Sequence, residues 1–178
     1  MSRKERVKPR DLREVIENGW SGRFNRKPYD EWTLLAFVLD VNDEITLVNA
    51  IDDDAGAIGF DVFLNKTVKS FLVYDDPEYC ESLVVKLKKI RPKKHPGISI
   101  DSISSVLRTA NELFPLLIIY REKVDPGACW VGKITDIKKK TFVMQEISPD
   151  GIWDNEPTIF KRRFRANLIT IRDVVKYN

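Results

Sequence analysis

The fold is decided by two stretches of the sequence, Leu35–Asp52 (LAFVLDVNDEITLVNAID) and Val131–Ser148 (VGKITDIKKKTFVMQEIS). Aligned at an offset of 96 residues (136 − 40), they keep their apolar pattern although few residues are identical, so that Val38 corresponds to Ile134. Each stretch contains two runs of β-branched and apolar residues separated by three polar residues. Because this pattern is typical of two strands joined by a turn, the sequence predicts a hairpin in each half.

The similarity continues beyond the hairpins, but at an offset of 100 residues (160 − 60). This offset pairs Phe60 with Phe160 and Phe71 with Ile171. It implies four extra loop residues in the second copy, within Ser148–Pro157. The sequence therefore predicts that the two halves share a topology and that the second half has the longer loop.

A short helical pattern precedes each hairpin, with apolar residues at the i, i+3, i+4 spacing of one buried face. The apolar residues are Leu12, Val15 and Ile16 in the first half and Ile103, Val106 and Leu107 in the second. Asp11, and Asp101 or Ser102, are candidate caps for the first turns. A further strand is predicted after each helix, at Arg23–Lys27 and at Leu116–Glu122.

The most linker-like segment is Arg91–Gly97, which holds two prolines, a glycine and several charges. We therefore expect a first unit over residues 1–90, a linker over 91–97 and a second unit over 98–178. The expected fold class is mainly β (α+β), with two tandem units that each contain a helix and a small β-barrel.

The order of a helix and about five short strands, with a late strand Asn167–Ile171, resembles small SH3-like or Sm-like β-barrels. The second half is also similar to uncharacterised bacterial proteins in which a strand like Leu116–Glu122 precedes one like Cys129–Ile134. Sm-like proteins that bind RNA carry an Asp/Asn loop and an Arg-Gly pair. Asn49–Asp52 matches the first motif in part, and the chain has no Arg-Gly pair. The resemblance thus implies a fold and does not imply uridine binding.

Composition excludes several classes of protein. Thirty basic and 27 acidic residues leave a formal net charge of +3, too small to indicate a nucleic-acid partner by overall electrostatics. The longest apolar stretch, near Pro115–Tyr120, is far shorter than the roughly 20 residues of a transmembrane helix. The first residues lack the apolar region of a signal peptide. We expect a cytoplasmic protein without a membrane partner.

Residues that could support catalysis or metal binding are few and scattered. Cys80 and Cys129 have no His or Cys at ligand spacing and are predicted to be reduced, buried thiols. His95 lies in the linker, without an adjacent carboxylate or nucleophile that would form a triad. Asp52–Asp54 is interpreted as a solvated turn before Gly56. We therefore expect no enzyme activity, metal or cofactor.

The candidate binding residues are mainly basic. Lys138, Lys139 and Lys140 form the second hairpin's turn, and alternation along a strand places Lys161, Arg163 and Arg165 on one face. Such cations contact phosphates or protect an edge strand from aggregation. Trp153 lies in the longer loop, where it either anchors a partner or packs on its own barrel.

The sequence favours a non-enzymatic binding or regulatory module with a protein partner or self-association. The alternative is a protein that binds single-stranded RNA or DNA through its basic residues. A third hypothesis, an enzyme built on Asp40, Asp52 and Asp136, is weaker, because Asp40 and Asp136 hold equivalent positions and more simply begin turns.

Overall fold

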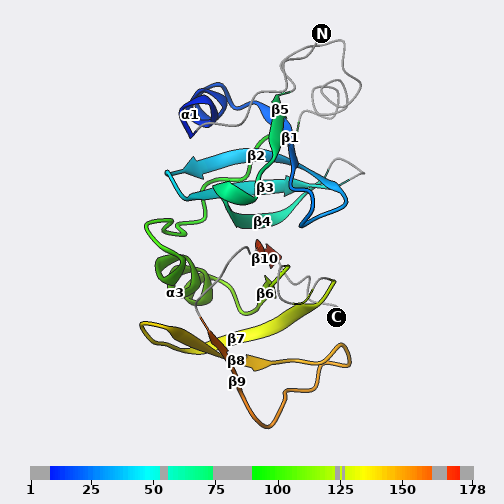
Figure 1. The fold of residues 1–178 in the computed structure, drawn as a ribbon, viewed down its shortest axis with the longest axis vertical. Coiled ribbons are helices and arrows are strands. Elements are labelled where there is room, and N and C mark those ends of the chain that lie inside the picture. Colours follow the sequence, from blue (N-terminus) through cyan, green and yellow to red (C-terminus); the bar gives the residue numbers. More distant parts are fainter. Residues whose placement is uncertain are drawn as a thin grey trace.

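In the part of the chain that the structure describes, ten antiparallel strands form one continuous open sheet, and one helix lies beside each half of it (Figure 1). The computed structural model describes residues 9–52, 56–73, 90–122, 125, 127–161 and 168–172. The first half comprises α1 (Pro9–Asn18), β1 (Ser21–Asn25), β2 (Thr33–Val41), β3 (Ile45–Ile51), β4 (Ala57–Leu64), a 3-10 turn (Asn65–Thr67) and β5 (Ser70–Val73). The second half comprises α3 (Ile103–Leu113), β6 (Leu117–Tyr120), β7 (Cys129–Ile137), β8 (Thr141–Glu146), β9 (Thr158–Lys161) and β10 (Leu168–Arg172).

The order of the strands repeats within the sheet. It is β5-β1-β2-β3-β4 and then β10-β6-β7-β8-β9, so each half contributes five adjacent strands in the same order. We call these groups the first set and the second set. They meet where β4 pairs with β10, from Leu168 opposite Phe63 to Arg172 opposite Gly59. This junction is named the joint below.

The two predicted hairpins are confirmed, with the same register in both. Val38 pairs with Val48 on β2 and β3, and Ile134 pairs with Met144 on β7 and β8, at the predicted offset of 96 residues. Each hairpin also has a register shift at the same place, just before Asp40 and just before Asp136. These two aspartates hold equivalent positions, as expected. They lie near the ends of strands beside a bulge, so the expectation that they begin turns is wrong.

The predicted offset of 100 residues after the hairpins is wrong. Phe160 pairs with Phe142, and the residue that holds this position in the first set is Phe63, which pairs with Thr46. The offset is thus 97 (160 − 63), and the segment before β9 is one residue longer than its equivalent, not four. Likewise, Ile169 pairs with Ile119 as Phe71 pairs with Phe24, so the predicted match of Phe71 with Ile171 is wrong. The apolar pattern does not determine the register of β4, because β4 has buried apolar residues on both faces.

The two faces of β3 and β4 belong mainly to two different clusters of buried side chains. The inner face of the first set packs with α1, through Leu12 and Val15 on the helix and Val48 and Phe63 on the sheet. The outer face of β3 and β4 belongs instead to the core of the second set. Its residues are Ile45, Leu47, Phe60, Val62 and Leu64. The joint is therefore buried on both faces of the sheet.

The predicted helices are confirmed, with small changes at their starts. Leu12 and Val15, and Val106 and Leu107, are buried as expected. Ser102 caps α3, because its hydroxyl accepts a hydrogen bond from the amide of Ser105 at 3.1 Å. Asp11 lies inside α1 and not before it.

The other predictions have mixed outcomes. The strands predicted at Arg23–Lys27 and Leu116–Glu122 are present as β1 and β6. Cys129 is exposed at the start of β7, so the prediction of a buried thiol is wrong there, and Cys80 lies outside the described residues. Residues 91–97 form neither helix nor strand, as expected, and the amide of Lys93 is held by Asn49 Oδ1 at 2.8 Å.

Candidate functional site

The free edge of β9 is the first feature of the candidate site. Within the part of the chain that the structure describes, β9 pairs with β8 on one side and with no strand on the other. Its equivalent in the first set, β4, pairs on both sides, because β10 covers its second edge. An unpaired edge presents backbone amides and carbonyls to an incoming strand. The second set thus leaves open the edge that the first set uses for the joint.

The outer face beside this edge is apolar and exposed. Val143 pairs with Ile159, and these residues hold the places of Leu47 and Val62 at the joint. The exposed fraction is 68% for Ile159 but 1% for Val62. A strand added to β9 would therefore cover a side chain whose equivalent is already buried by the second set.

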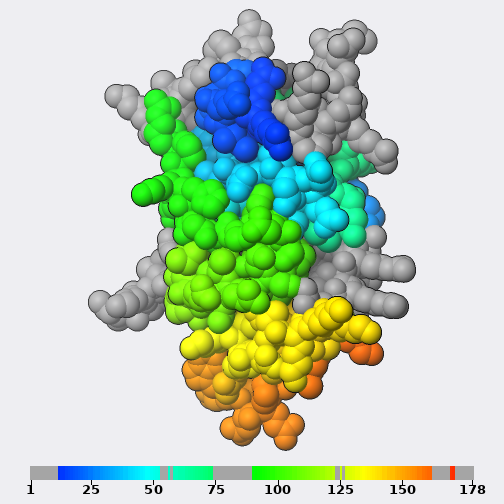
Figure 2. Space-filling view, turned by 90° about the vertical axis from the view of Figure 1, so that its left-hand side faces the viewer, coloured from blue at the N-terminus to red at the C-terminus, as the bar shows by residue number. Residues whose placement is uncertain are grey.

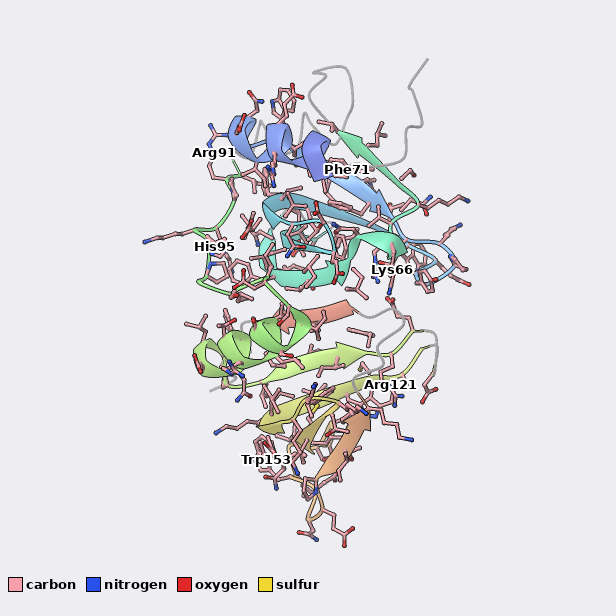
Figure 3. All side chains as sticks on the ribbon, turned by 60° about the vertical axis from the view of Figure 1, so that its left-hand side comes forward. Lys66, Phe71, Arg91, His95, Arg121 and Trp153 are labelled. Carbon is pink, nitrogen blue, oxygen red and sulfur yellow. The ribbon has the colours of Figure 1, made fainter. Side chains whose placement is uncertain are left out.

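The segment before β9 extends this apolar face. Trp153 forms an isolated bridge with Ile147, and alternation along β8 puts Ile147 on the same face as Val143. Trp153 remains 44% exposed and the neighbouring Ile152 67% exposed. Figure 2 shows this segment, in orange, projecting as the lower tip of the molecule, and Figure 3 labels Trp153 there.

The basic candidates lie at the opposite end of β8 from Trp153. The amide of Lys138 donates to the Thr141 carbonyl, and Thr141 pairs with Lys161, so the lysine turn and Lys161 are adjacent. Lys138 also forms an ion pair with Asp136 at 3.4 Å. Six residues of strand separate Thr141 from Ile147, about 20 Å. The structure thus brings Lys138, Lys139, Lys140 and Lys161 together and leaves Trp153 apart, while Arg163 and Arg165 lie outside the described residues.

Strand pairing also identifies equivalent residues at the ends of β1 and β6. Asn25 pairs with Thr33 and Tyr120 pairs with Cys129, and these two partners are related by the 96-residue offset of the hairpins. Tyr120 is therefore the counterpart of Asn25. It follows that Arg121 is the counterpart of Arg26, and Glu122 is the counterpart of Lys27.

Both arginines lie over the ring of an equivalent phenylalanine. The guanidinium carbon of Arg26 is 5.3 Å from the ring centre of Phe63, and that of Arg121 is 5.7 Å from the ring centre of Phe160. Arg121 also lies 5.6 Å from the ring centre of Trp130. These distances are those of cation–π contacts, which hold each guanidinium beside an edge strand of its own set.

The two arginines differ in their acidic partner. Arg26 is 1% exposed, and its Nη2 donates to Glu122 Oε2 of the second set at 2.7 Å. Burial raises the pKa of the Glu122 carboxyl, although the Arg26 guanidinium acts in the opposite direction. Among the described residues, no carboxylate forms an ion pair with Arg121. Arg121 therefore has the position of Arg26 but lacks the carboxylate that a following set would supply.

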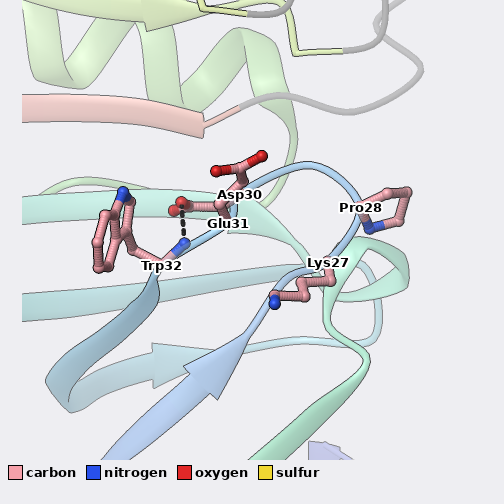
Figure 4. A pocket seen from close by; sticks show the side chains of 5 residues that line it. All are labelled: Lys27, Pro28, Asp30, Glu31 and Trp32. Atoms are coloured by element: carbon pink, nitrogen blue, oxygen red, sulfur yellow. Dashed lines mark hydrogen bonds between the residues drawn. The ribbon is translucent and has the colours of Figure 1, made fainter.

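Open clefts also lie among the described residues away from this edge. One, of about 530 Å³, is lined by Lys27, Pro28, Asp30, Glu31 and Trp32, with the Trp32 amide bonded to Asp30 Oδ1 (Figure 4). Another, of about 270 Å³, lies between α3 and β7, where the Asn111 side chain bonds the amide and the carbonyl of Ile134. The first is lined by a surface loop and the second by residues of α3 and β7, and neither brings together reactive side chains among the described residues.

Catalytic and metal-binding groupings are sparse in the same part of the chain. His95 Nε2 lies 3.7 Å from Asp40 Oδ2, so the expectation that no carboxylate stands beside His95 is wrong. Asp52 Oδ1 accepts from the amide of Gly56, as expected for a turn. No group of three or more His, Cys, Asp or Glu side chains in the described residues is arranged to hold a metal ion.

Comparisons with protein-family models, with curated proteins and with solved structures found no match to this chain. In the described ranges, no helix has the length and apolar character needed to span a membrane. Sequence reasoning missed Arg26, Arg121, Glu122 and Ile159. The equivalence of the two arginines was detectable only once the strand registers were known, because β1 and β6 share almost no residue identity.

Proposed function

We propose that the chain is an internally duplicated, non-enzymatic protein-binding module, made of two small units of the SH3-like or Sm-like kind. Its binding site is the β9 edge with the adjoining outer face. The observation that supports this most directly is the joint, because β4 there accepts a strand and buries its outer face. β9 occupies the equivalent place with the same register toward its hairpin partner.

The joint also indicates how binding proceeds. At the joint, backbone pairing runs over five residue pairs while apolar side chains pack on the sheet. Strand addition of this kind derives affinity from main-chain hydrogen bonds and specificity from alternate side chains. In the second set, Val143, Ile159 and Trp153 are the residues available for such packing.

A peptide with the sequence of residues 166–173 tests whether β9 accepts a strand, because it contains the strand that pairs with β4. Millimolar peptide added to the full chain is expected to slow hydrogen exchange at the β9 amides. The same peptide with proline in place of Thr170 lacks one backbone donor and should have a weaker effect. Equal exchange of β9 with and without the first peptide would contradict the proposal.

Two protein variants locate the effect. Ile159→Lys places a charge in the apolar face and should abolish the slowing of exchange. Lys139→Ala alters an exposed turn residue and should leave it unchanged. Loss of the effect in both variants, or in neither, would place the peptide elsewhere.

A nucleic-acid function is the second candidate, favoured by the adjacency of the lysine turn to Lys161. Phosphate contacts made by these lysines would weaken as the salt concentration rises. Binding of a labelled single-stranded oligonucleotide over a salt series tests this directly. Affinity that is absent at about 50 mM salt, or that survives the substitution of Lys139, Lys140 and Lys161 by Glu, would exclude the candidate.

A further inference from the structure

We infer that the partner of the β9 edge is a different protein that supplies a carboxylate to Arg121, and that a second copy of this chain is rejected there because it supplies Lys27. The inference rests on the proposed function and specifies the chemistry of the partner. It follows from comparing the joint with the contact that a second copy would make in the same geometry.

The free edge of the first set is the natural candidate for a second copy. β5 pairs with β1 on one side and with no described strand on the other, and it is the counterpart of β10. At the joint, Ile169 stands opposite Val62. The equivalent pairing between two copies places Phe71 of one opposite Ile159 of the other. The backbone of Thr158–Phe160 could therefore pair with β5 of another copy, head to tail, while Pro157 takes the place of Phe60 and offers no amide hydrogen.

The contact between two copies would differ from the joint in the charge of one side chain. Glu122 follows β6 and reaches the buried Arg26 across the joint at 2.7 Å. Its counterpart, Lys27, follows β1 and would stand in the same place beside Arg121 of the other copy. The carboxylate is thus replaced by an ammonium group next to a guanidinium. Like charges brought together in an interface disfavour association and so suppress a wrong partner.

The outer face of the second set is also more basic than the equivalent face at the joint. Ile45 and Leu64, which are buried at the joint, correspond to Thr141 and Lys161 in the second set. The exposed face therefore keeps an apolar centre at Val143 and Ile159 and adds a cation at its end. A partner that fits it offers an edge strand, apolar side chains on one face and carboxylates toward Arg121 and Lys161. The matching occupant is an acidic strand-bearing protein.

The charge argument is tested by making the second copy resemble that partner. Lys27→Glu gives the first set the carboxylate that Glu122 provides at the joint. Sedimentation equilibrium over a concentration series is expected to show the wild-type chain as a monomer and the variant as self-associating, at least about tenfold more tightly. Lys94→Glu makes the same charge change at an exposed linker residue and should remain monomeric. Figure 3 shows that this linker, at His95, lies on the side of the molecule away from Arg121.

A second substitution tests whether the new carboxylate at position 27 pairs with Arg121. Lys27→Glu combined with Arg121→Gln should return the chain to the monomer, because the new carboxylate then lacks its cation. Association of the wild-type chain through β9, or a monomeric Lys27→Glu variant, would overturn the inference. So would association of the Lys27→Glu variant that persists after Arg121→Gln.

Ile159→Lys in the Lys27→Glu background separates this inference from the proposed function. Loss of association shows that the copies meet at β9. Association that persists with Ile159→Lys shows that they meet elsewhere, which overturns the inference. The proposed function is judged separately, by the exchange of β9 amides with the strand peptide.

The expected register supplies an independent check. In a Lys27→Glu chain that also carries Cys80→Ser and Cys129→Ser, the pair Phe71→Cys and Ile159→Cys should form an intermolecular disulfide when a mild two-electron thiol oxidant is added. The pair Phe71→Cys and Lys161→Cys should form less disulfide, because the equivalent of Lys161 at the joint, Leu64, lies beyond the paired residues. Equal yields from both pairs would contradict the register.

Discussion

The Arg26 guanidinium, buried in the first half of the chain, donates from Nη2 to Glu122 Oε2 of the second half at 2.7 Å. The Phe63 ring and the hydroxyl of Thr67 also contact Arg26, whereas its Nη1 has no hydrogen-bond partner in the described residues. One ion pair thus connects the two sets of strands beside the paired β4 and β10. This ion pair belongs to the joint. At the β9 edge, Arg121 holds the position of Arg26 but has no equivalent of the Glu122 carboxylate.

Removal of one partner of this pair should strongly destabilise the fold. We expect Glu122→Ala to lower the free energy of unfolding by about 3–5 kcal/mol, because it leaves the Arg26 charge buried without compensation. The double variant Arg26→Met/Glu122→Leu removes both charges and should recover most of this loss. Urea unfolding measures both variants. A double variant no more stable than Glu122→Ala would contradict this account of the pair.

The pH dependence of stability should reveal the raised pKa of Glu122. A carboxyl whose pKa is higher in the folded than in the unfolded protein binds its proton more tightly when folded. Its contribution to stability is complete below the unfolded pKa and is lost as the pH rises through the folded pKa. Glu122→Gln does not titrate, so the free energy of unfolding of the wild type minus that of this variant should fall with rising pH. A difference that grows with pH would show that pairing with Arg26 outweighs burial.

Truncation of two consecutive residues of β9 should have very different effects on stability. Phe160 is 1% exposed and stacks on Phe142, with ring centres 4.9 Å apart and an interplanar angle of 7°. Phe160→Ala should cost about 3–5 kcal/mol of stability. Ile159→Ala should change stability by less than about 0.5 kcal/mol, because its side chain is exposed. Similar losses for both would show that the outer face of β9 is covered within the monomer.

Asn111 should fix the position of α3 on β7. Its amide donates to the Ile134 carbonyl at 2.9 Å and its oxygen accepts from the Ile134 amide at 2.8 Å, beside the bulge of β7. Asn111→Ala leaves both backbone groups without this partner and should lower the free energy of unfolding by about 1–3 kcal/mol. Glu112→Ala, at the next and exposed position, is the matched control and should have little effect.

Cys129 should react with a thiol reagent in the folded protein, since it is exposed at the start of β7. Labelling with Ellman's reagent under native conditions, followed by peptide mapping, is expected to place label on Cys129. The Cys129→Ser variant lacks that site. An unlabelled Cys129 in the folded chain would restore the expectation of a buried thiol.

The local parts of the fold were predictable from the order of residues. Both hairpins, their matching register at Val38 and Ile134, and the helices before them followed from alternating apolar residues, polar turns and helical spacing. These signals are local because a strand, a turn and a neighbouring strand lie within about 20 residues. For the same reason the turn at Lys138–Lys140, between β7 and β8, was predictable from the sequence.

The tertiary structure alone decided how the halves join and which edge remains open. Strand β4 has apolar residues on both faces, so its alternation does not show its register, and Phe60 was matched where Phe63 belongs. The pairing of β4 with β10 and the contact of Arg26 with Glu122 join residues about a hundred positions apart. Such contacts depend on which backbone edges and buried charges meet in space. The residue pattern of one strand does not show which distant strand pairs with it.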